Sequence, residues 1–143
     1  MSATGDLLDV NVWLAFAVEG HPHHWAALSA WRDLDRPSFC RVTQLSFLRL
    51  LCNAQVMGNE RFEPEKAWVE YEHLEESGTV YYAEEPPTLA DALKGFAKGG
   101  RTSRDFWTDA YLAAFAKAAG MRLVSFDGGF SRFRNVDFLN LTV

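Results

Sequence analysis

The sequence predicts an α/β domain of three layers (α/β/α), in which helices cover both faces of a central parallel sheet of four to five strands. Short apolar runs of strand length alternate along the chain with longer stretches of helical periodicity. No Asn-Gly pair, a strong hairpin signal, joins two of these runs. Consecutive strands are therefore expected to connect through helices, which makes them parallel. With 143 residues and 48% hydrophobic content, the chain can bury one core.

The first half of the chain is expected to supply two strands and four helices. In chain order these are a strand at 6–10, helices at 11–18 and 22–34, a strand at 38–42, and helices at 43–53 and 64–76. Pro22 and Pro64 suit the first turn of their helices, because proline lacks the N–H that has no helical partner there. Thr43 is expected to be the N-cap of the helix that follows it.

The second half repeats this alternation. The predicted elements are a strand at 79–82, helices at 88–98 and 106–119, and strands at 121–125 and 136–138. Thr88 with Asp91 three residues later resembles a capping box, with aspartate in place of the usual glutamate. Gly120 follows the last helical residue, where a left-handed C-cap is expected. No repeat, linker or low-complexity segment divides the chain, so residues 1–143 are expected to form a single domain.

Composition narrows the class of protein. The net charge of −5 argues against a broad basic surface that binds nucleic acid nonspecifically, although carboxylates gathered around a metal also add negative charge. Cys40 and Cys52 are too few for a disulfide framework, so we expect reduced thiols in a cytoplasmic protein. The first residues resemble no signal peptide, and no apolar stretch is long enough to span a bilayer.

Three aspartates are expected to meet at one edge of the sheet. Asp9 and Asp127 each follow a predicted strand, and Asp109 lies in the first turn of a helix that can reach the same edge. Carboxylates this close repel one another and raise their pKa values unless a cation intervenes. Mg²⁺ or Mn²⁺ relieves the repulsion, prefers oxygen ligands and can activate water for phosphodiester hydrolysis.

Each aspartate also has an ordinary structural explanation. Asp9 could cap the first helix, and Asp109 could favour a helix N-terminus through the macrodipole. Asp127, followed by two glycines, could be a turn residue. Because all three fall at the predicted site edge, we expect them to act together.

Four stretches in this order resemble the PIN-domain ribonucleases, and among them the VapC-type toxins of bacterial toxin–antitoxin pairs. The stretches are Leu8-Asp9-Val10-Asn11, Thr43-Gln44-Leu45-Ser46-Phe47-Leu48-Arg49, Thr108-Asp109-Ala110-Tyr111-Leu112-Ala113-Ala114 and Val124-Ser125-Phe126-Asp127. The resemblance implies a PIN fold, Mg²⁺ or Mn²⁺ dependence and endonucleolytic cleavage of RNA, whether tRNA, rRNA or mRNA. It also implies a homodimer and inhibition by a cognate VapB-type antitoxin.

The resemblance also assigns roles to residues. Asp9, Asp109 and Asp127 match the metal-binding acids of the family. Asn11, Thr43 and Ser125 match positions that orient these acids or water, although helix capping explains Asn11 and Thr43 equally well. Beside the site, Arg101 and Arg104 could steer an RNA backbone or lie in a solvated loop; Arg132 and Arg134 could act similarly.

The chain departs from the family at one position. Most PIN nucleases carry a glutamate six residues beyond a serine or threonine in the helix after the second strand, and six residues beyond Thr43 this chain has Arg49. Arg49 could pair with an aspartate of a three-acid site and contact the scissile phosphate. Asp105, one turn before Asp109, could supply a fourth carboxylate or simply cap its helix. The remaining alternative is a weakened metal site in a noncatalytic module that binds RNA or protein.

Overall fold

The computed structural model describes residues 5–142. It contains a five-stranded sheet in which every strand pair is parallel. The strands are β1 (Asp6–Leu8), β2 (Pro37–Phe39), β3 (Tyr81–Tyr82), β4 (Arg122–Ser125) and β5 (Phe138–Asn140). Their spatial order is β3-β2-β1-β4-β5. The predicted parallel sheet of four to five strands is therefore confirmed, at the upper number.

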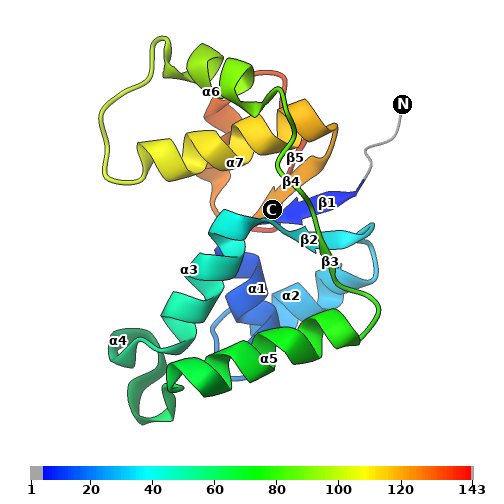
Figure 1. Cartoon of the computed structure of the whole chain (residues 1–143), viewed down its shortest axis with the longest axis vertical. Coiled ribbons are helices and arrows are strands. Elements are labelled where there is room, and N and C mark those ends of the chain that lie inside the picture. The colour runs from blue at the N-terminus through cyan, green and yellow to red at the C-terminus, as the bar shows by residue number, and fades with distance from the viewer. Residues whose placement is uncertain (1–4, 143) are drawn as a thin grey trace.

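Helices cover both faces of this sheet, as predicted (Figure 1). On one face lie α1 (Val10–Ala17), α2 (His24–Trp31), α3 (Arg41–Leu51), the short α4 (Ala54–Met57) and α5 (Pro64–Glu76). On the other face lie α6 (Leu89–Ala97) and α7 (Phe106–Ala119). Two 3₁₀ segments complete the fold, η1 (Gly58–Glu60) and η2 (Gly128–Arg132). The three-layer α/β/α arrangement is confirmed.

The two central strands separate the core into two halves. Leu7 of β1 and Leu123 of β4 are buried against α7. The next residues of the two strands, Leu8 and Val124, are buried in the other half, together with α1 and α3. This alternation is the period of two that a strand buried on both faces requires. Because both strands are held on both faces in this way, the residues that follow β1 and β4 lie at the carboxyl edge of the sheet.

The helix boundaries agree best with prediction where proline or glycine marks an end. The helices predicted at 64–76 and 106–119 have those bounds in α5 and α7. Pro64 is the first residue of α5, and Gly120 ends α7 in the left-handed conformation, with a φ of 68°. The short α4 and η1, between Asn53 and Arg61, were not predicted.

Several predicted boundaries were wrong. The strands predicted at 6–10 and 38–42 are shorter, and the last begins at Phe138 rather than at residue 136. Thr43 is not an N-cap, because α3 begins two residues earlier with Cys40 at that position, and the Thr43 hydroxyl instead accepts from the Cys40 N–H at 2.9 Å. Thr88 occupies an N-cap position but makes no capping hydrogen bond with its side chain.

An ion pair holds β1 against β4 at the amino edge of the sheet. The Arg122 guanidinium donates two hydrogen bonds of 2.8 Å to the two carboxylate oxygens of Asp6, which is 1% exposed. The backbone N–H of Asp35 donates a third to the same carboxylate. This pair lies at the end of the strands opposite to Asp9 and Ser125. Among the helices of residues 5–142, none is both long and apolar enough to cross a bilayer.

Candidate active site

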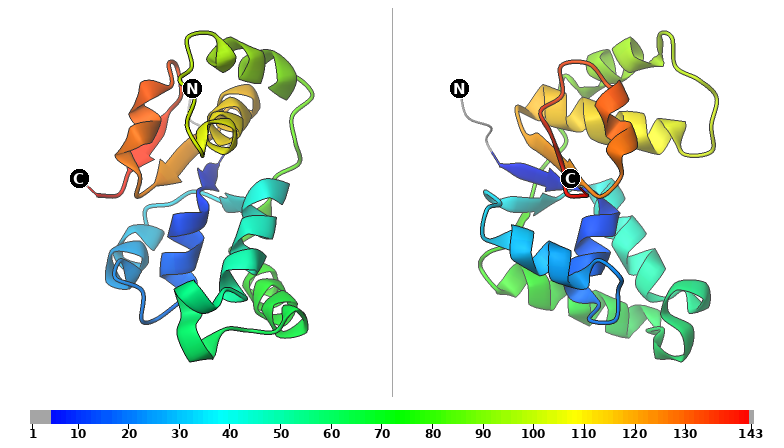
Figure 2. Two further views of the ribbon diagram at one scale, coloured as in Figure 1. Left: turned by 90° about the vertical axis from the view of Figure 1, so that its left-hand side faces the viewer. Right: turned by 180° about the vertical axis from the view of Figure 1, so that it is seen from behind.

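The order of the strands reverses direction at β1, which lies between β2 on one side and β4 on the other. In open parallel sheets, sites form at the carboxyl edge beside such a reversal. Asp9 follows β1 directly, and its N–H donates to the Val124 carbonyl at 2.9 Å. The left view of Figure 2 looks onto this edge, with α7 above the sheet and α1 and α3 below it.

Asp9 has the structural role considered for it, that of a helix cap. Its Oδ1 accepts from the Val10 N–H at 2.7 Å, so it is the N-cap of α1. Its Oδ2 accepts from the Ser125 hydroxyl at 2.8 Å. The predicted structural role is confirmed, and it leaves the second carboxylate oxygen facing β4.

Ser125 and Asn11 connect the ends of the two central strands. The Ser125 Oγ, which is fully buried, also accepts from the Asn11 amide at 3.1 Å and from the Asp127 N–H at 2.9 Å. The Asn11 side-chain carbonyl accepts from the Phe126 N–H at 3.3 Å. Ser125 thus holds Asp9 and the Asp127 N–H in place, and Asn11 in turn holds Ser125 and the backbone before Asp127.

Asp127 and Asp109 approach the same edge from two other elements. The Asp127 carboxylate accepts from the Gly129 N–H at 2.9 Å and caps η2, which confirms its structural role as a turn residue. Asp109 lies in the first turn of α7, and its Oδ2 accepts from the Arg132 guanidinium at 3.0 Å. Arg132 also donates to the Gly129 carbonyl at 2.6 Å within η2, and its bond to Asp109 ties η2 to α7.

The pKa shifts at this edge indicate that the negative charges of the three carboxylates act on one another. Burial, together with the negative charges of Asp109 and Asp127, raises the pKa of Asp9 to about 6, although hydrogen bonds from Ser125 and Val10 oppose this rise. Burial also raises the pKa of Asp109, with Asp127 and Asp105 adding to the rise and Arg132 opposing it. Mutual destabilisation of charged carboxylates is the condition that a bound cation relieves.

The oxygen donors fit a hard divalent ion in kind, and each of the three aspartates comes from a different element. Within residues 5–142, however, no three acidic, histidine or cysteine side chains already form a closed group of ligands. Arg132 holds Asp109, and the Gly129 N–H holds Asp127. An ion that used all three carboxylates would therefore compete with Arg132 for Asp109.

The remaining predicted residues lie around this edge. Asp105 is exposed at the N-cap position of α7 without a capping hydrogen bond, and its charge acts on Asp109. Thr43 is buried and bonded to the backbone of Cys40. Arg101 and Arg104 are exposed in the segment before α7.

Arg49 does not have the ion pair considered for it. It is exposed on α3, beside Cys52, Asn53 and Trp68, and within residues 5–142 it pairs with none of the three aspartates. The arginine that pairs with an aspartate of the edge is Arg132, which the sequence indicated only as a weaker candidate for contact with RNA. The one available signal was an arginine that follows Asp127 closely in the chain.

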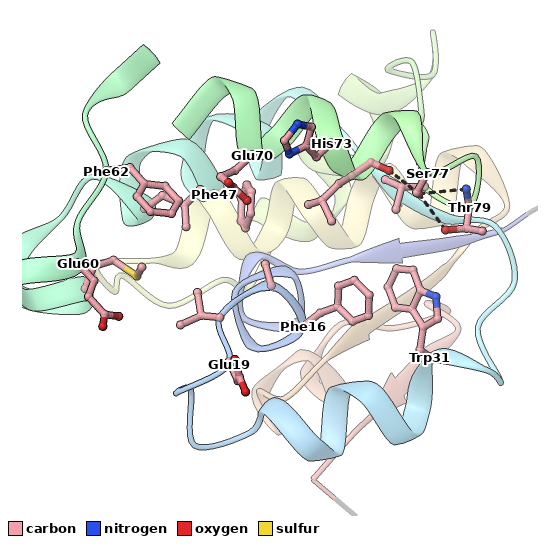
Figure 3. A pocket seen from close by; sticks show the side chains of 16 residues that line it. Phe16, Glu19, Trp31, Phe47, Glu60, Phe62, Glu70, His73, Ser77 and Thr79 are labelled. Carbon is pink, nitrogen blue, oxygen red and sulfur yellow. Dashed lines mark hydrogen bonds between the residues drawn. The ribbon is translucent and has the colours of Figure 1, made fainter. Parts of the chain in front are cut away.

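A separate apolar hollow of about 380 Å³ lies among the helices on one side of the sheet (Figure 3). Its walls come from α1, α2, α3 and α5, and it includes the stacked rings of Phe16 and Trp31, whose centroids are 3.9 Å apart. Glu19, Glu60 and Glu70 are its carboxylates. None of the predicted site residues lines it, so it is distinct from the acidic edge.

The fold and the site together indicate the class of protein, because carboxylates lie at the edge of a parallel sheet where the strand order reverses. The chain belongs to the PIN-domain family, whose model matches residues 7–136. Ribonuclease VapC41 from Mycobacterium tuberculosis (strain CDC 1551 / Oshkosh) is 39% identical over 139 residues, which cover 92% of this chain and 94% of that protein. The predicted resemblance to VapC-type PIN ribonucleases is thus confirmed.

Solved structures show the same fold at lower identity. VapBC2 from Rickettsia felis, bound to a DNA fragment from its promoter, matches with a TM-score of 0.66 and 11% identity, covering 94% of this chain and 97% of that one. VapC20 from Mycobacterium tuberculosis, a toxin that cleaves the sarcin–ricin loop, matches with a TM-score of 0.64 and 17% identity, covering 92% and 97%.

Proposed function

We propose that this chain is a metal-dependent endoribonuclease and the toxin of a VapBC-type toxin–antitoxin pair, built as one PIN domain over residues 1–143. The observation that carries the proposal is the meeting of Asp9, Asp109 and Asp127 at the carboxyl edge, where their charges act on one another. The 39% identity to a named VapC ribonuclease supports RNA as the substrate.

In this proposal Asp9, Asp109 and Asp127 hold one Mg²⁺ or Mn²⁺, with Asp105 available as a further carboxylate. The ion would supply a Lewis acid for the scissile phosphate and lower the pKa of a bound water. Asn11 and Ser125 keep the Asp9 carboxylate oriented through their hydrogen bonds. Thr43 supports the start of α3 beside the edge, and the exposed Arg49 is available to a substrate phosphate.

The partners follow from the same family. We expect a cognate VapB-type antitoxin, which the VapBC complexes among the structural neighbours support. We also expect a homodimer that acts in the cytoplasm on tRNA, rRNA or mRNA. Arg101 and Arg104 would contribute to contacts with the RNA backbone.

The test is RNA cleavage by purified protein in Mn²⁺ or Mg²⁺, with a panel of structured RNAs. We expect cleavage that EDTA abolishes and that falls about a hundredfold or more in Asp9→Asn and in Asp109→Asn. Asp33→Asn is the matched control, since Asp33 is exposed and belongs to the loop after α2. Intact RNA with wild-type protein, or equal cleavage by Asp9→Asn, would refute the proposal.

One observation favours a second function, a noncatalytic PIN module that binds RNA or protein. Arg132 already neutralises Asp109, and Arg49 replaces the usual glutamate. Titration calorimetry with Mn²⁺ separates the two functions. Mn²⁺ binding that is lost in Asp9→Asn supports the nuclease. A wild-type protein that binds no Mn²⁺ but still binds RNA or antitoxin supports the module.

A further inference from the structure

A large cavity opens beside the acidic edge, between α6, α7 and the segment that follows β4. Its volume is about 970 Å³, near the upper end of the roughly 300–1,000 Å³ usual for sites that enclose a small ligand. Phe96, Phe106 and Phe133 form its apolar walls. The left view of Figure 2 shows α6 above α7, with η2 beside α7.

The charge of this cavity is opposite to that of the chain. Five of the 14 lysines and arginines line it, against one carboxylate, that of Asp91. The five are Lys98, Arg101, Lys117, Arg132 and Arg134. The protein as a whole carries a net charge of −5, so this concentration of cations creates a local positive field.

Within the described part of the chain, four of these cations have no carboxylate partner. Throughout residues 5–142, the only ion pair that any of the five makes is that of Arg132 with Asp109. Lys117 lies over the ring of Phe96, with its nitrogen 5.4 Å from the ring centroid. Unpaired cations around a hollow favour an anion that balances them, and an aromatic wall beside them suits a ligand that also has flat apolar parts.

Arg132 connects the cavity to the acidic edge. The same guanidinium lines the cavity and donates to Asp109 at 3.0 Å. Phe106, the first residue of α7, lines the cavity three residues before Asp109. A polyanion seated in the cavity therefore continues directly to the aspartates, and its negative charge would compete with Asp109 for Arg132.

We propose that this cavity binds the phosphodiester backbone of the RNA substrate next to the bond that is cleaved, through Lys98, Arg101, Lys117 and Arg134, with Arg132 shared between RNA and Asp109. The proposal rests on the proposed function and adds the place and the residues of substrate binding. RNA fits better than an acidic peptide, because its alternation of phosphates and flat bases matches the cations and the phenylalanines together.

The experiment measures binding of a labelled single-stranded oligoribonucleotide of mixed sequence by fluorescence anisotropy, in EDTA so that no cleavage occurs. The test variant is the double reversal Arg101→Glu/Arg134→Glu. The matched control is Arg32→Glu/Arg61→Glu, which reverses two exposed arginines outside the cavity and changes net charge equally. Thermal unfolding of both variants verifies the fold, and Arg101→Gln/Arg134→Gln repeats the test with a milder change.

We expect the cavity reversal to weaken binding about tenfold or more, and the control to change it by less than about threefold. The salt dependence should also fall in the cavity variant, by roughly 0.7 in the slope of log K for each phosphate that the protein no longer neutralises. Equal weakening in both variants, or none in the cavity variant, overturns the proposal. The proposal is also overturned if the cavity reversal weakens binding of a short polyaspartate peptide and leaves RNA binding unchanged.

The RNA site and the nuclease activity can fail separately. If the wild-type protein binds RNA through the cavity but never cleaves it with metal, the proposed nuclease fails and the RNA site stands. If the wild-type protein cleaves RNA and the cavity reversal binds and cleaves normally, the RNA site fails and the nuclease stands.

Discussion

The Ser125 hydroxyl donates a hydrogen bond of 2.8 Å to Asp9 Oδ2, across the two strands that meet at the middle of the sheet. Ser125 is fully buried, and its Oγ at the same time accepts from Asn11 and from the N–H of Asp127. The Ser125 hydroxyl therefore fixes the positions of two of the three aspartates, through the carboxylate of Asp9 and the backbone of Asp127. Loss of Ser125 should therefore disturb the site without removing an acid.

Ser125→Ala should lower both stability and cleavage. It leaves the half-buried Asp9 Oδ2 without its donor, which costs about 1–3 kcal/mol of unfolding free energy. It also removes the hydrogen bond that lowers the pKa of Asp9, so metal-dependent cleavage should begin at a higher pH than in the wild type. Urea unfolding and a pH profile of the cleavage rate measure the two effects. Ser131→Ala, at an exposed position, is the control.

The pH dependence of stability follows from the sign of the Asp9 shift. Folding raises the pKa of Asp9 from 3.8 to about 6, so the folded state binds this proton more tightly than the unfolded state. The resulting stability is fully present below about pH 4 and is lost as pH rises through 6, by roughly 3 kcal/mol. In EDTA, Asp9→Asn should remove this component and be at least as stable as the wild type at pH 7. A variant less stable than the wild type across the whole range would contradict this linkage.

Arg132→Gln should bind Mn²⁺ more tightly than the wild type, about tenfold. The substitution removes the cation that now neutralises Asp109, so a divalent ion meets a more negative site. Cleavage should nevertheless fall, since the same side chain is assigned to RNA. Calorimetry with Mn²⁺ and cleavage kinetics measure the two responses. The control is Arg49→Gln, which should leave Mn²⁺ affinity within about twofold, because Arg49 pairs with none of the three aspartates.

Asp6→Ala should destabilise the fold without altering the chemistry of the site. The Asp6 carboxylate is buried and accepts two hydrogen bonds from Arg122, so its removal should cost about 3 kcal/mol. Lys66→Ala removes an exposed ion pair with Glu70 and should cost less than about 1 kcal/mol. Urea unfolding compares the two variants. A cleavage rate for Asp6→Ala that differs from wild type well below its unfolding temperature would place Asp6 in the site after all.

Sequence-based prediction succeeded where a local signal was strong. The bounds of α5 and α7 follow from Pro64 and Gly120, which mark a helix start and a helix end. Strands of two or three residues, such as β3, contain too little periodicity to fix their ends. The prediction of Thr43 as the N-cap was wrong in position. Its side chain does accept from a free backbone N–H, that of Cys40, but it does so from the third position of the helix.

The site was predictable only in part. Asp9 and Asp127 follow strands, so the topology of a parallel sheet brings them to one edge whatever the details of packing. The contact of Arg132 with Asp109, 23 residues earlier, depends on how η2 folds back against α7, which no local pattern specifies. The contact of Arg122 with Asp6 spans 116 residues and depends on strand register. Side-chain pairs of this kind are decided by tertiary structure.

The acidic edge joins two layers of the molecule. Asp9 follows β1 and Ser125 ends β4, whereas Asp109 belongs to α7 and Arg132 to η2, whose Phe130 is buried in the same core cluster as α7. An ion that joined Asp9 to Asp109 and Asp127 would therefore connect the sheet with the helix layer that covers it. Because such an ion would bind only the folded arrangement, part of the free energy of metal binding would stabilise the contact between the two layers.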